Sequence, residues 1–426
     1  MDRSSEPDDL LADTDGRLHH LLLPAIKSGG QGAIYQTREP NIGVKILKSG
    51  EPAVDIVRSV RRLPIEDLTS IAAPLSTLQD RPGYVMVWLR GMVPLSENRL
   101  PPRGRLPEIV EWYVASGGLR RRLALCARLA EVIADLHGRG LVYVDLSMAN
   151  VMVSESGSAA EVRLIDLDNL RSATDQTLSV LTERWAAPEL FKPQPPSRHS
   201  DAYSLALVAF TVLTGYHPFD DGDLVRHTPE GSPERIAAAR GQLPSFIDPE
   251  DTSNTTSSYL FPLDVVLTPT LLETFQRAFG SGRDQVDERP TAANLRRILW
   301  DAHDRTVTCS CGFTTYLGTG SCAACEKPFD DVFNIEVRAS PSSPPTAAIT
   351  IGANPIAVQR RHLPLPVEPR TRHDEVVRVS IEHGALVLDT APGWFCGTGT
   401  LQHDDCTELT NDNGTSVTLR AVAHAS

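Results

Sequence analysis

The chain has 426 residues, of which 41 are lysine or arginine and 54 are aspartate or glutamate, so its formal net charge is −13. This acidic balance argues against nucleic acid or an anionic membrane surface as the main partner, because both require basic patches. Charged residues make up 22% and hydrophobic residues 41%, as in an ordinary globular protein, and seven cysteines are too few for a disulfide scaffold. At roughly 150 residues per domain, the length predicts two or three domains.

The N-terminal segment predicts no targeting signal. Residues 1–16 are acidic and polar and lack the apolar core of a signal peptide. The longest apolar run, residues 204–213, is too short to span a bilayer and predicts a buried helix. We therefore expect a cytoplasmic protein with no membrane partner, whose residues 1–18 form a flexible tail.

The next segment alternates short apolar runs with glycine and proline turns, which is typical of strands. A helix is predicted at 53–63, and strands are predicted at 21–26, 33–37, 43–47, 75–79 and 84–89. From residue 107 to residue 300 the pattern becomes mostly helical. Residues 119–137 carry apolar side chains at three- and four-residue spacing, which predicts a core helix.

Two features of the predicted strands suit phosphate binding. Gly29, Gly30 and Gly32 lie between two strands, where backbone amides could approach phosphate oxygens closely. Lys45 lies in the middle of the next apolar strand, where a charge is costly unless an anion meets it. Taken separately, a structural hairpin and a solvent-facing lysine remain alternatives for these features.

Three polar residues follow the core helix in an otherwise apolar context. Asp145 and Asn150 are five residues apart, and Asp166 follows a short strand-like run. Phosphoryl transfer requires a carboxylate that orients the attacking hydroxyl and oxygen ligands that hold magnesium at the triphosphate. Each residue could instead cap a turn, but their order and spacing together favour a phosphoryl-transfer site.

In this combination the sequence resembles the protein kinase family over about residues 21–300. The resemblance implies an α+β, two-lobed kinase-like fold over 19–303, with a small lobe at 19–90 and a large lobe at 91–303. It implies ATP and Mg²⁺ (or Mn²⁺) as cofactors and transfer of the γ-phosphate to Ser or Thr hydroxyls of a protein substrate. A nucleotide-binding pseudokinase scaffold and a kinase of a small-molecule hydroxyl are the alternatives.

The resemblance also assigns roles residue by residue. Asp145 and Lys45 are the implied catalytic residues, and Asn150 and Asp166 are the implied magnesium ligands. The implied ATP-binding residues lie in the phosphate loop, on the strands and in the hinge: Gly29, Gly30, Gly32, Ile34, Lys45, Val87 and Leu89. Structural roles are implied for Asp201, at the start of a buried central helix, and for Glu189 paired with Arg289.

Several positions depart from the family pattern. Val144 replaces an arginine that receives the activation-loop phosphate, which predicts activity independent of loop phosphorylation. Ser147 replaces a lysine that assists the γ-phosphate, and Asp168 replaces the glycine of the metal-binding triplet. The glutamate that pairs with the strand lysine is not evident, and the candidates are Glu51, Asp55 and Glu66.

Four of the cysteines form two closely spaced pairs, Cys309 with Cys311 and Cys322 with Cys325. Four thiolates at this spacing can close a tetrahedron around Zn²⁺, and the metal would supply folding energy to a segment too short for a core. Unliganded cysteines are the alternative. The pattern resembles a zinc ribbon at 304–331, and bacterial kinases with such a ribbon are accompanied by phosphatase and von Willebrand-type partners.

The remaining residues predict a linker and a further module. Residues 332–370 are rich in proline and serine and predict a linker. Residues 371–426 alternate apolar and polar side chains, which predicts a small all-β module, a sandwich or a barrel, with a docking role. Its two cysteines, Cys396 and Cys406, are expected to be buried free thiols, and a disulfide or a metal site is the alternative.

Overall fold

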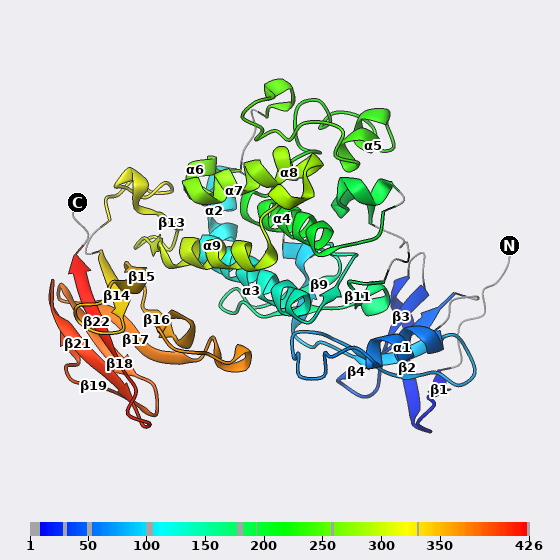
Figure 1. Cartoon of the computed structure of the whole chain (residues 1–426), viewed down its shortest axis with the longest axis horizontal. Helices are drawn as coiled ribbons and strands as arrows, with labels where there is room; N and C mark the ends of the chain where they lie inside the picture. Colours follow the sequence, from blue (N-terminus) through cyan, green and yellow to red (C-terminus); the bar gives the residue numbers. More distant parts are fainter. Residues whose placement is uncertain are drawn as a thin grey trace. The chain divides into compact units, whose positions relative to one another are not determined.

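The structure is a computed structural model that describes residues 9–28, 32–48, 53–98, 105–175, 177, 182–192, 194–256, 260–329 and 332–423. The chain forms two compact units, which are described separately (Figure 1). Unit 1 contains residues 1–100, 125–259 and 273–297, and unit 2 contains residues 101–124, 260–272 and 298–426. Within the described ranges, none of the helices combines the length and apolarity that a membrane span requires.

Unit 1 begins with a six-stranded antiparallel sheet in the order β1-β2-β3-β4-β6-β5, and helix α1 packs against its β5 and β6 strands (Figure 1). Side chains alternate between the two faces of each strand, so neighbours such as Val44 and Lys45 point in opposite directions. The elements are β1 (Leu10–Ala12), β2 (Leu18–Ser28), β3 (Gly32–Thr37), β4 (Ile42–Leu47), α1 (Ala53–Arg61), β5 (Pro74–Thr77) and β6 (Gly83–Val87). The predicted strands and the helix near residue 53 are confirmed.

The expectation of a flexible tail over 1–18 is wrong for residues 9–18. Strand β1 pairs with β2 and buries Leu11 in the sheet. The buried carboxylate of Asp13 lies 2.9 Å from Nε2 of His19 and accepts a hydrogen bond from Ser76 at 2.7 Å. The prediction failed because a three-residue strand in polar sequence has too little apolar alternation to be distinguished from a tail.

The rest of unit 1 is mostly helical and is built around α4 (Arg198–Thr214), whose residues 200–214 are all buried. A helix that is apolar all round belongs inside a core, as predicted for residues 204–213. Helices α5 (Pro233–Ala239) and α8 (Ser281–Asp284) also lie in this unit, and it contains residues 125–138 of α3 (Gly118–Gly138), 273–279 of α7 (Pro269–Phe279) and 292–297 of α9 (Ala292–Asp304). Helix α3 confirms the core helix predicted at 119–137.

Short strands form two small sheets in the same unit. The first has the order β10-β9-β7 and the second pairs β11 with β8. Their bounds are β7 (Met92–Pro94), β8 (Leu141–Val142), β9 (Val151–Ser154), β10 (Val162–Leu164) and β11 (Arg171–Ser172). The antiparallel β9–β10 hairpin matters most, because the residues beside its open end include two of the predicted metal ligands.

Unit 2 contains a helical part and a β part. The helical part includes α2 (Leu106–Ala115) and α6 (Leu263–Val266), followed along the chain by the hairpin β12 (Thr306–Thr308) and β13 (Thr314–Tyr316). The rings of Tyr113, Phe261 and Phe313 pack against one another, with centroids 4.8 to 5.5 Å apart. This aromatic cluster joins α2 and the segment before α6 to the cysteine hairpin.

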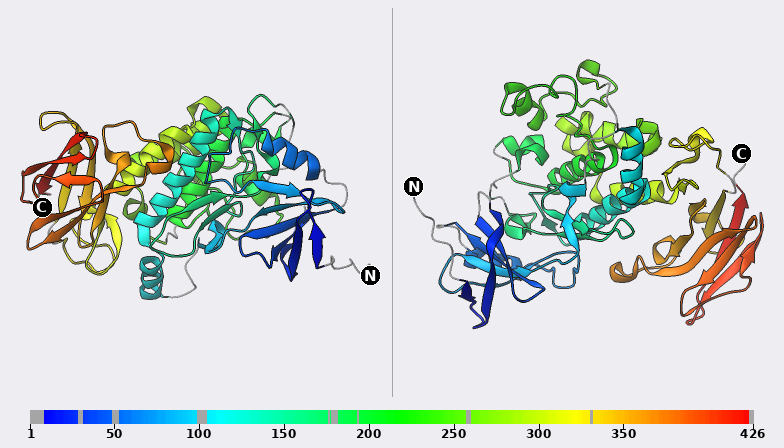
Figure 2. Two further views of the ribbon diagram at one scale, coloured as in Figure 1. Left: turned by 90° about the horizontal axis from the view of Figure 1, so that it is seen from below. Right: turned by 180° about the vertical axis from the view of Figure 1, so that it is seen from behind.

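The β part of unit 2 is a sandwich of two antiparallel sheets, ordered β15-β14-β22-β21-β19 and β16-β17-β18-β20 (Figure 2). One hydrophobic core contains residues of both sheets. The strands are β14 (Phe333–Arg338), β15 (Pro345–Ile351), β16 (Ile356–Gln359), β17 (Glu375–Glu382), β18 (Ala385–Thr390), β19 (Trp394–Cys396), β20 (Thr400–Leu401), β21 (Cys406–Asn411) and β22 (Ser416–Ala423).

The predicted linker over 332–370 is wrong, because this segment supplies β14, β15 and β16 to the sandwich. Prolines such as Pro345 suggested a linker, but Pro345 is the first residue of the edge strand β15, where proline is tolerated. Arg361, also in the predicted linker, forms an ion pair with Asp304 at 2.6 Å and stacks 3.8 Å from the ring of Trp300. The expectation for Cys406 is also wrong, since its side chain is exposed, whereas Cys396 is partly buried.

A buried ion pair ties two distant segments of unit 1 together. Nη1 and Nη2 of Arg289 donate to the two carboxylate oxygens of Glu189 at 2.7 and 2.8 Å. The guanidinium also donates to the backbone carbonyl of Gly282 at 2.6 Å. Two parallel charge-assisted bonds of this kind are strong and directional.

We predict that Glu189→Ala destabilises unit 1 by about 3–5 kcal/mol, because it leaves the buried Arg289 charge without its carboxylate. The measurement is urea unfolding. Asp55→Ala, which removes an exposed carboxylate paired with Arg58, is the control and should leave the midpoint unchanged. Equal midpoints for Glu189→Ala and the wild type would contradict the prediction.

Candidate functional site

Lys45 is the buried cation at the centre of the site. It is 5% exposed, and its Nζ lies 2.8 Å from Oδ1 of Asp166 and 2.8 Å from Oδ2 of Asp168. Burial alone would lower the pKa of Lys45, but the two carboxylates outweigh it and raise this pKa above its ordinary value. Burial and the charge of Asp166 raise the pKa of Asp168. The group is an ammonium shared by two carboxylates.

The β9–β10 hairpin explains why Asn150 and Asp166 are close. Val151 lies opposite Leu164 in the antiparallel ladder, so the residues just before β9 and just after β10 meet at one end. The amide of Ile165 donates to the carbonyl of Asn150 at 3.1 Å, which fixes this end. Asp166 itself has a left-handed backbone with φ of 58°.

Asp145 is held from two sides. Its Oδ2 accepts a hydrogen bond from the side chain of Asn150 at 3.2 Å, and its Oδ1 accepts one from the backbone amide of Thr182 at 3.0 Å. The second contact links the carboxylate to the segment that precedes Glu189. Ser147, which stands where the family has a lysine, is 2% exposed, so its hydroxyl faces the interior.

Asp201 holds the loop that carries Asp145. From α4, its buried carboxylate accepts hydrogen bonds from the backbone amides of Tyr143 at 2.7 Å and Val144 at 2.8 Å. It also lies 3.1 Å from Nε2 of His137. Val144 has a φ of 78°, a backbone state that a β-branched residue adopts only when its surroundings enforce it. The carboxylate supplies that constraint.

The predicted nucleotide-binding residues are described only in part. Gly29, Gly30 and Glu51 lie outside the described residues. A Cβ added to Gly32 would come 2.2 Å from the carbonyl oxygen of Ile46, so the close approach of β3 and β4 requires glycine there. Ile34 lies directly opposite Lys45. Val87 ends β6 and Leu89 follows two residues later, where the predicted hinge begins.

The lysine does not pair with the two described candidates, Asp55 and Glu66. Asp55 is exposed and pairs with Arg58 at 3.2 Å, and Glu66 is exposed. The sequence analysis did not predict that Asp168 pairs with Lys45 or that Tyr84 supports this pair. The hydroxyl of Tyr84 donates to Oδ1 of Asp168 at 2.9 Å. Two features of the sequence could have indicated this arrangement. Asp168 stands where the family has a glycine, and Tyr84 lies on the strand that pairs with the strand of Lys45.

The site residues fit the groups that phosphoryl transfer requires. Asn150 and Asp166 provide oxygen atoms, which are the ligands that Mg²⁺ prefers. Lys45 provides a positive charge next to them, and Asp145 provides a carboxylate linked to Asn150. Together they can hold a metal–phosphate group and orient a hydroxyl.

The four paired cysteines come together in unit 2. The sulfur atoms of Cys309, Cys311, Cys322 and Cys325 all lie within 4.8 Å of one another. The sulfur of Cys309 is 3.6 Å from that of Cys325, and the sulfur of Cys311 is 3.7 Å from that of Cys322. A tetrahedron with Zn–S bonds of about 2.3 Å has sulfur atoms about 3.8 Å apart, so these residues fit a zinc ion.

The thiols of this cluster differ in how readily they ionise, because burial raises the pKa of Cys311 and raises that of Cys322 to about 12, whereas the pKa of Cys309 is lowered. Burial raises the pKa of the Cys309 thiol, but hydrogen bonds from the Cys311 backbone and the other thiols outweigh it and lower this pKa to about 7. Gly312 turns the loop with a φ of 86°. The cluster therefore combines converging sulfur atoms with one thiol that ionises readily.

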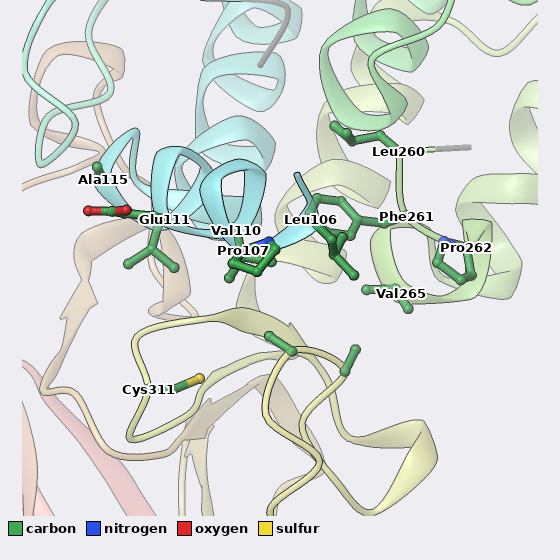
Figure 3. A pocket seen from close by; sticks show the side chains of 13 residues that line it. Leu106, Pro107, Val110, Glu111, Ala115, Leu260, Phe261, Pro262, Val265 and Cys311 are labelled. Atoms are coloured by element: carbon green, nitrogen blue, oxygen red, sulfur yellow. The ribbon is translucent and has the colours of Figure 1, made fainter. Parts of the chain in front are cut away.

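An apolar cavity of about 800 Å³ lies beside the cysteine loops in unit 2. Figure 3 shows side chains of α2 and of the segment before and within α6 facing the loop that carries Cys311. Among the labelled residues are Leu106, Val110 and Phe261. Among the described residues that line it, Glu111 supplies the one carboxylate and none carries a basic side chain, so these residues do not supply the charges that bind a nucleotide phosphate.

Comparison with known proteins agrees with this geometry. Residues 117–256 match the family model described as protein kinase domain. The matched residues contain Asp145, Asn150, Asp166 and Glu189. The match supports a protein kinase-like family for this part of the chain. The two-lobed kinase-like fold expected from the sequence is consistent with the mixture of strands and helices in unit 1.

Individual relatives cover different shares of the chain. It is 34% identical over 243 residues to serine/threonine-protein kinase pkn2 of Myxococcus xanthus, covering 52% of this chain and 27% of that protein. It is 32% identical over 127 residues to ribosomal protein S6 kinase alpha-3 of Mus musculus, covering 29% of this chain and 16% of that one. With PknB of Mycolicibacterium smegmatis it shares 31% identity over 137 residues, 28% of this chain and 21% of that kinase. The chain thus spans less than a third of the length of these relatives.

We predict that Asp201→Asn lowers the free energy of unfolding by about 3 kcal/mol, because it removes a charged acceptor from two buried amides. Hydrogen–deuterium exchange should show faster exchange at Tyr143 and Val144. Asp145→Asn is the matched control, because it leaves these two bonds intact. Unchanged protection at both amides in Asp201→Asn would contradict this prediction.

Proposed function

We propose that this chain is an ATP-dependent protein kinase that transfers the γ-phosphate to Ser or Thr hydroxyls of a protein substrate. The observation that carries the proposal is the convergence of Lys45, Asp145, Asn150 and Asp166 in one hydrogen-bonded site. The kinase relatives support the reaction class. A scaffold without turnover would not need all four residues, which favours an enzyme.

Each of the four site residues would have a separate role in the reaction. Bound Mg-ATP would supply the phosphoryl group and the metal charge that neutralises it. Lys45 would hold the phosphates, while Asn150 and Asp166 would hold the metal. Asp145 would orient the substrate hydroxyl and accept its proton. Catalysis of this type depends on positioning and electrostatics, which the fixed hairpin and the Asp201 anchor supply.

We further propose that activity does not require phosphorylation of the activation segment. Val144 is 3% exposed and offers no charge for a loop phosphate. The backbone amide of Thr182 already bonds to Asp145, and Nη1 of Arg171 donates to the carbonyl of Thr177 at 2.8 Å. The activation segment is thus held by hydrogen bonds to its own backbone at Thr177 and Thr182, the second of which reaches Asp145, and neither bond involves a phosphate.

Asp145→Asn should reduce phosphate transfer by about 10²- to 10⁴-fold, because the side chain can no longer accept the proton. The measurement is transfer from radiolabelled ATP to the protein itself and to a mixed protein extract, with Asp55→Asn as a surface control. Equal labelling by wild type and Asp145→Asn would contradict the proposal. A rise in melting temperature with nucleotide but without turnover would indicate a pseudokinase, and ADP release that requires an added metabolite would indicate a small-molecule kinase.

We propose that the cysteine cluster is a zinc ribbon that organises its own segment of unit 2. The support is the sulfur geometry and the shortness of the loops, which have little apolar material of their own. Zinc would replace a hydrophobic core as the source of folding energy there. A phosphatase and a von Willebrand-type protein are proposed as partners of this chain, on the resemblance to bacterial kinases with a ribbon.

Elemental analysis of protein purified without chelator should find one zinc per chain. Cys311→Ser should lower the zinc content severalfold, because it removes one of four ligands. Cys406→Ser, outside the cluster, should retain full content. Absence of zinc from the wild-type protein would refute the ribbon.

A further inference from the structure

Asp168 has a fixed partner on each of its carboxylate oxygens. Oδ2 lies 2.8 Å from Nζ of Lys45, and Oδ1 accepts the hydroxyl proton of Tyr84 at 2.9 Å. Its side chain is 12% exposed, whereas that of Asp166 is 29% exposed. Of the two carboxylates that share the lysine, Asp168 is the more enclosed, and Asp166 is the more accessible to a metal ion.

The backbone explains this arrangement. Lys45 on β4 lies directly opposite Tyr84 on β6, so both side chains leave the sheet on the same face, with Nζ 5.6 Å from the ring centroid. The left-handed residue Asp166 starts a 3₁₀ turn over Leu167–Asn169, and Leu167 is buried. This turn presents Asp168 to the two donors from the sheet.

Helix α1 does not contribute a carboxylate to Lys45 within its described residues. It buries Val57 and Val60, and its Asp55 is exposed and paired with Arg58. In the usual kinase arrangement a glutamate on the small-lobe helix forms the lysine ion pair, and its position controls activity. Here the acid comes from the segment that follows the metal-binding aspartate.

We propose that Asp168 is the positioning residue of Lys45, which keeps the ammonium directed at the nucleotide phosphates and leaves Asp166 available for the metal. The inference rests on the proposed kinase function. Tyr84 supports it by fixing the second oxygen of Asp168. A consequence is that displacement of α1 does not change the orientation of the lysine.

The first test measures ADP affinity by calorimetry, once with Mg²⁺ and once with EDTA. Asp168→Asn should weaken ADP binding about tenfold in both conditions, because it acts through a charge-assisted bond to Lys45 and not through the metal. Asp168→Glu should restore part of the affinity, and Asp55→Asn, the control on α1, should leave it unchanged. If Asp168→Asn weakens ADP binding only in the presence of Mg²⁺, Asp168 is a metal ligand and the proposal is overturned. Unchanged ADP affinity in both conditions would also overturn it.

The second test needs no nucleotide and therefore separates the proposal from the proposed function. Urea unfolding is measured for Lys45→Met, Asp168→Asn and the double variant. The effects on the unfolding equilibrium constant should be non-additive by about threefold or more, because the two residues contact each other. Additive effects would show that Lys45 and Asp168 are not coupled and would overturn the positioning role of Asp168, whether or not the wild type binds nucleotide. Failure of the wild type to bind nucleotide is a separate result, which would refute the proposed kinase function.

Discussion

The site depends on one constraint: the buried ammonium of Lys45 must have anionic neighbours. A cation on an apolar strand is stable only if its charge is compensated, and the compensation comes from the segment at residues 166–168. Because that segment follows the β9–β10 hairpin, the ion pair also fixes Asp166 beside Asn150. The interaction thus links the strands proposed to face the nucleotide to the residues that would hold the metal.

A second buried charge fixes the loop that carries Asp145. Asp201 on α4 binds the amides of Tyr143 and Val144, the two residues immediately before Asp145. Helix α4 is enclosed by aromatic side chains such as Phe275 and Phe279, so the carboxylate has a rigid base. The position of Asp145 is therefore set from the core, whereas its two oxygens are held by Asn150 and the amide of Thr182. Such preorganisation is what phosphoryl transfer requires.

The sequence alone predicted the candidate site residues from their polarity and the two long helices from their periodicity. Lys45, Asp145, Asn150 and Asp166 could be found because their polarity is unusual among apolar neighbours, and α3 and α4 because their apolar spacing is long and regular. The partner of Lys45 could not be found, because Asp168 becomes its neighbour only through a left-handed turn and the register of β4 with β6. Strand β1 and strands β14 to β16 were missed for a different reason. Strand β1 is only three residues long, and the segment of β14 to β16 is rich in proline and serine, with Pro345 at the start of β15 and Pro355 just before β16, which is the composition of a linker.

In the arrangement that we propose, Asp168 orients Lys45 within a nucleotide-binding kinase site. A crystal structure of the chain with ADP and Mg²⁺ tests it most directly. We expect Nζ of Lys45 to contact the phosphates while it remains within hydrogen-bonding distance of Asp168, and we expect Asp166 and Asn150 to bind the metal. A structure in which Lys45 leaves Asp168 for a carboxylate of the small-lobe helix, or in which ADP lies elsewhere, would contradict it.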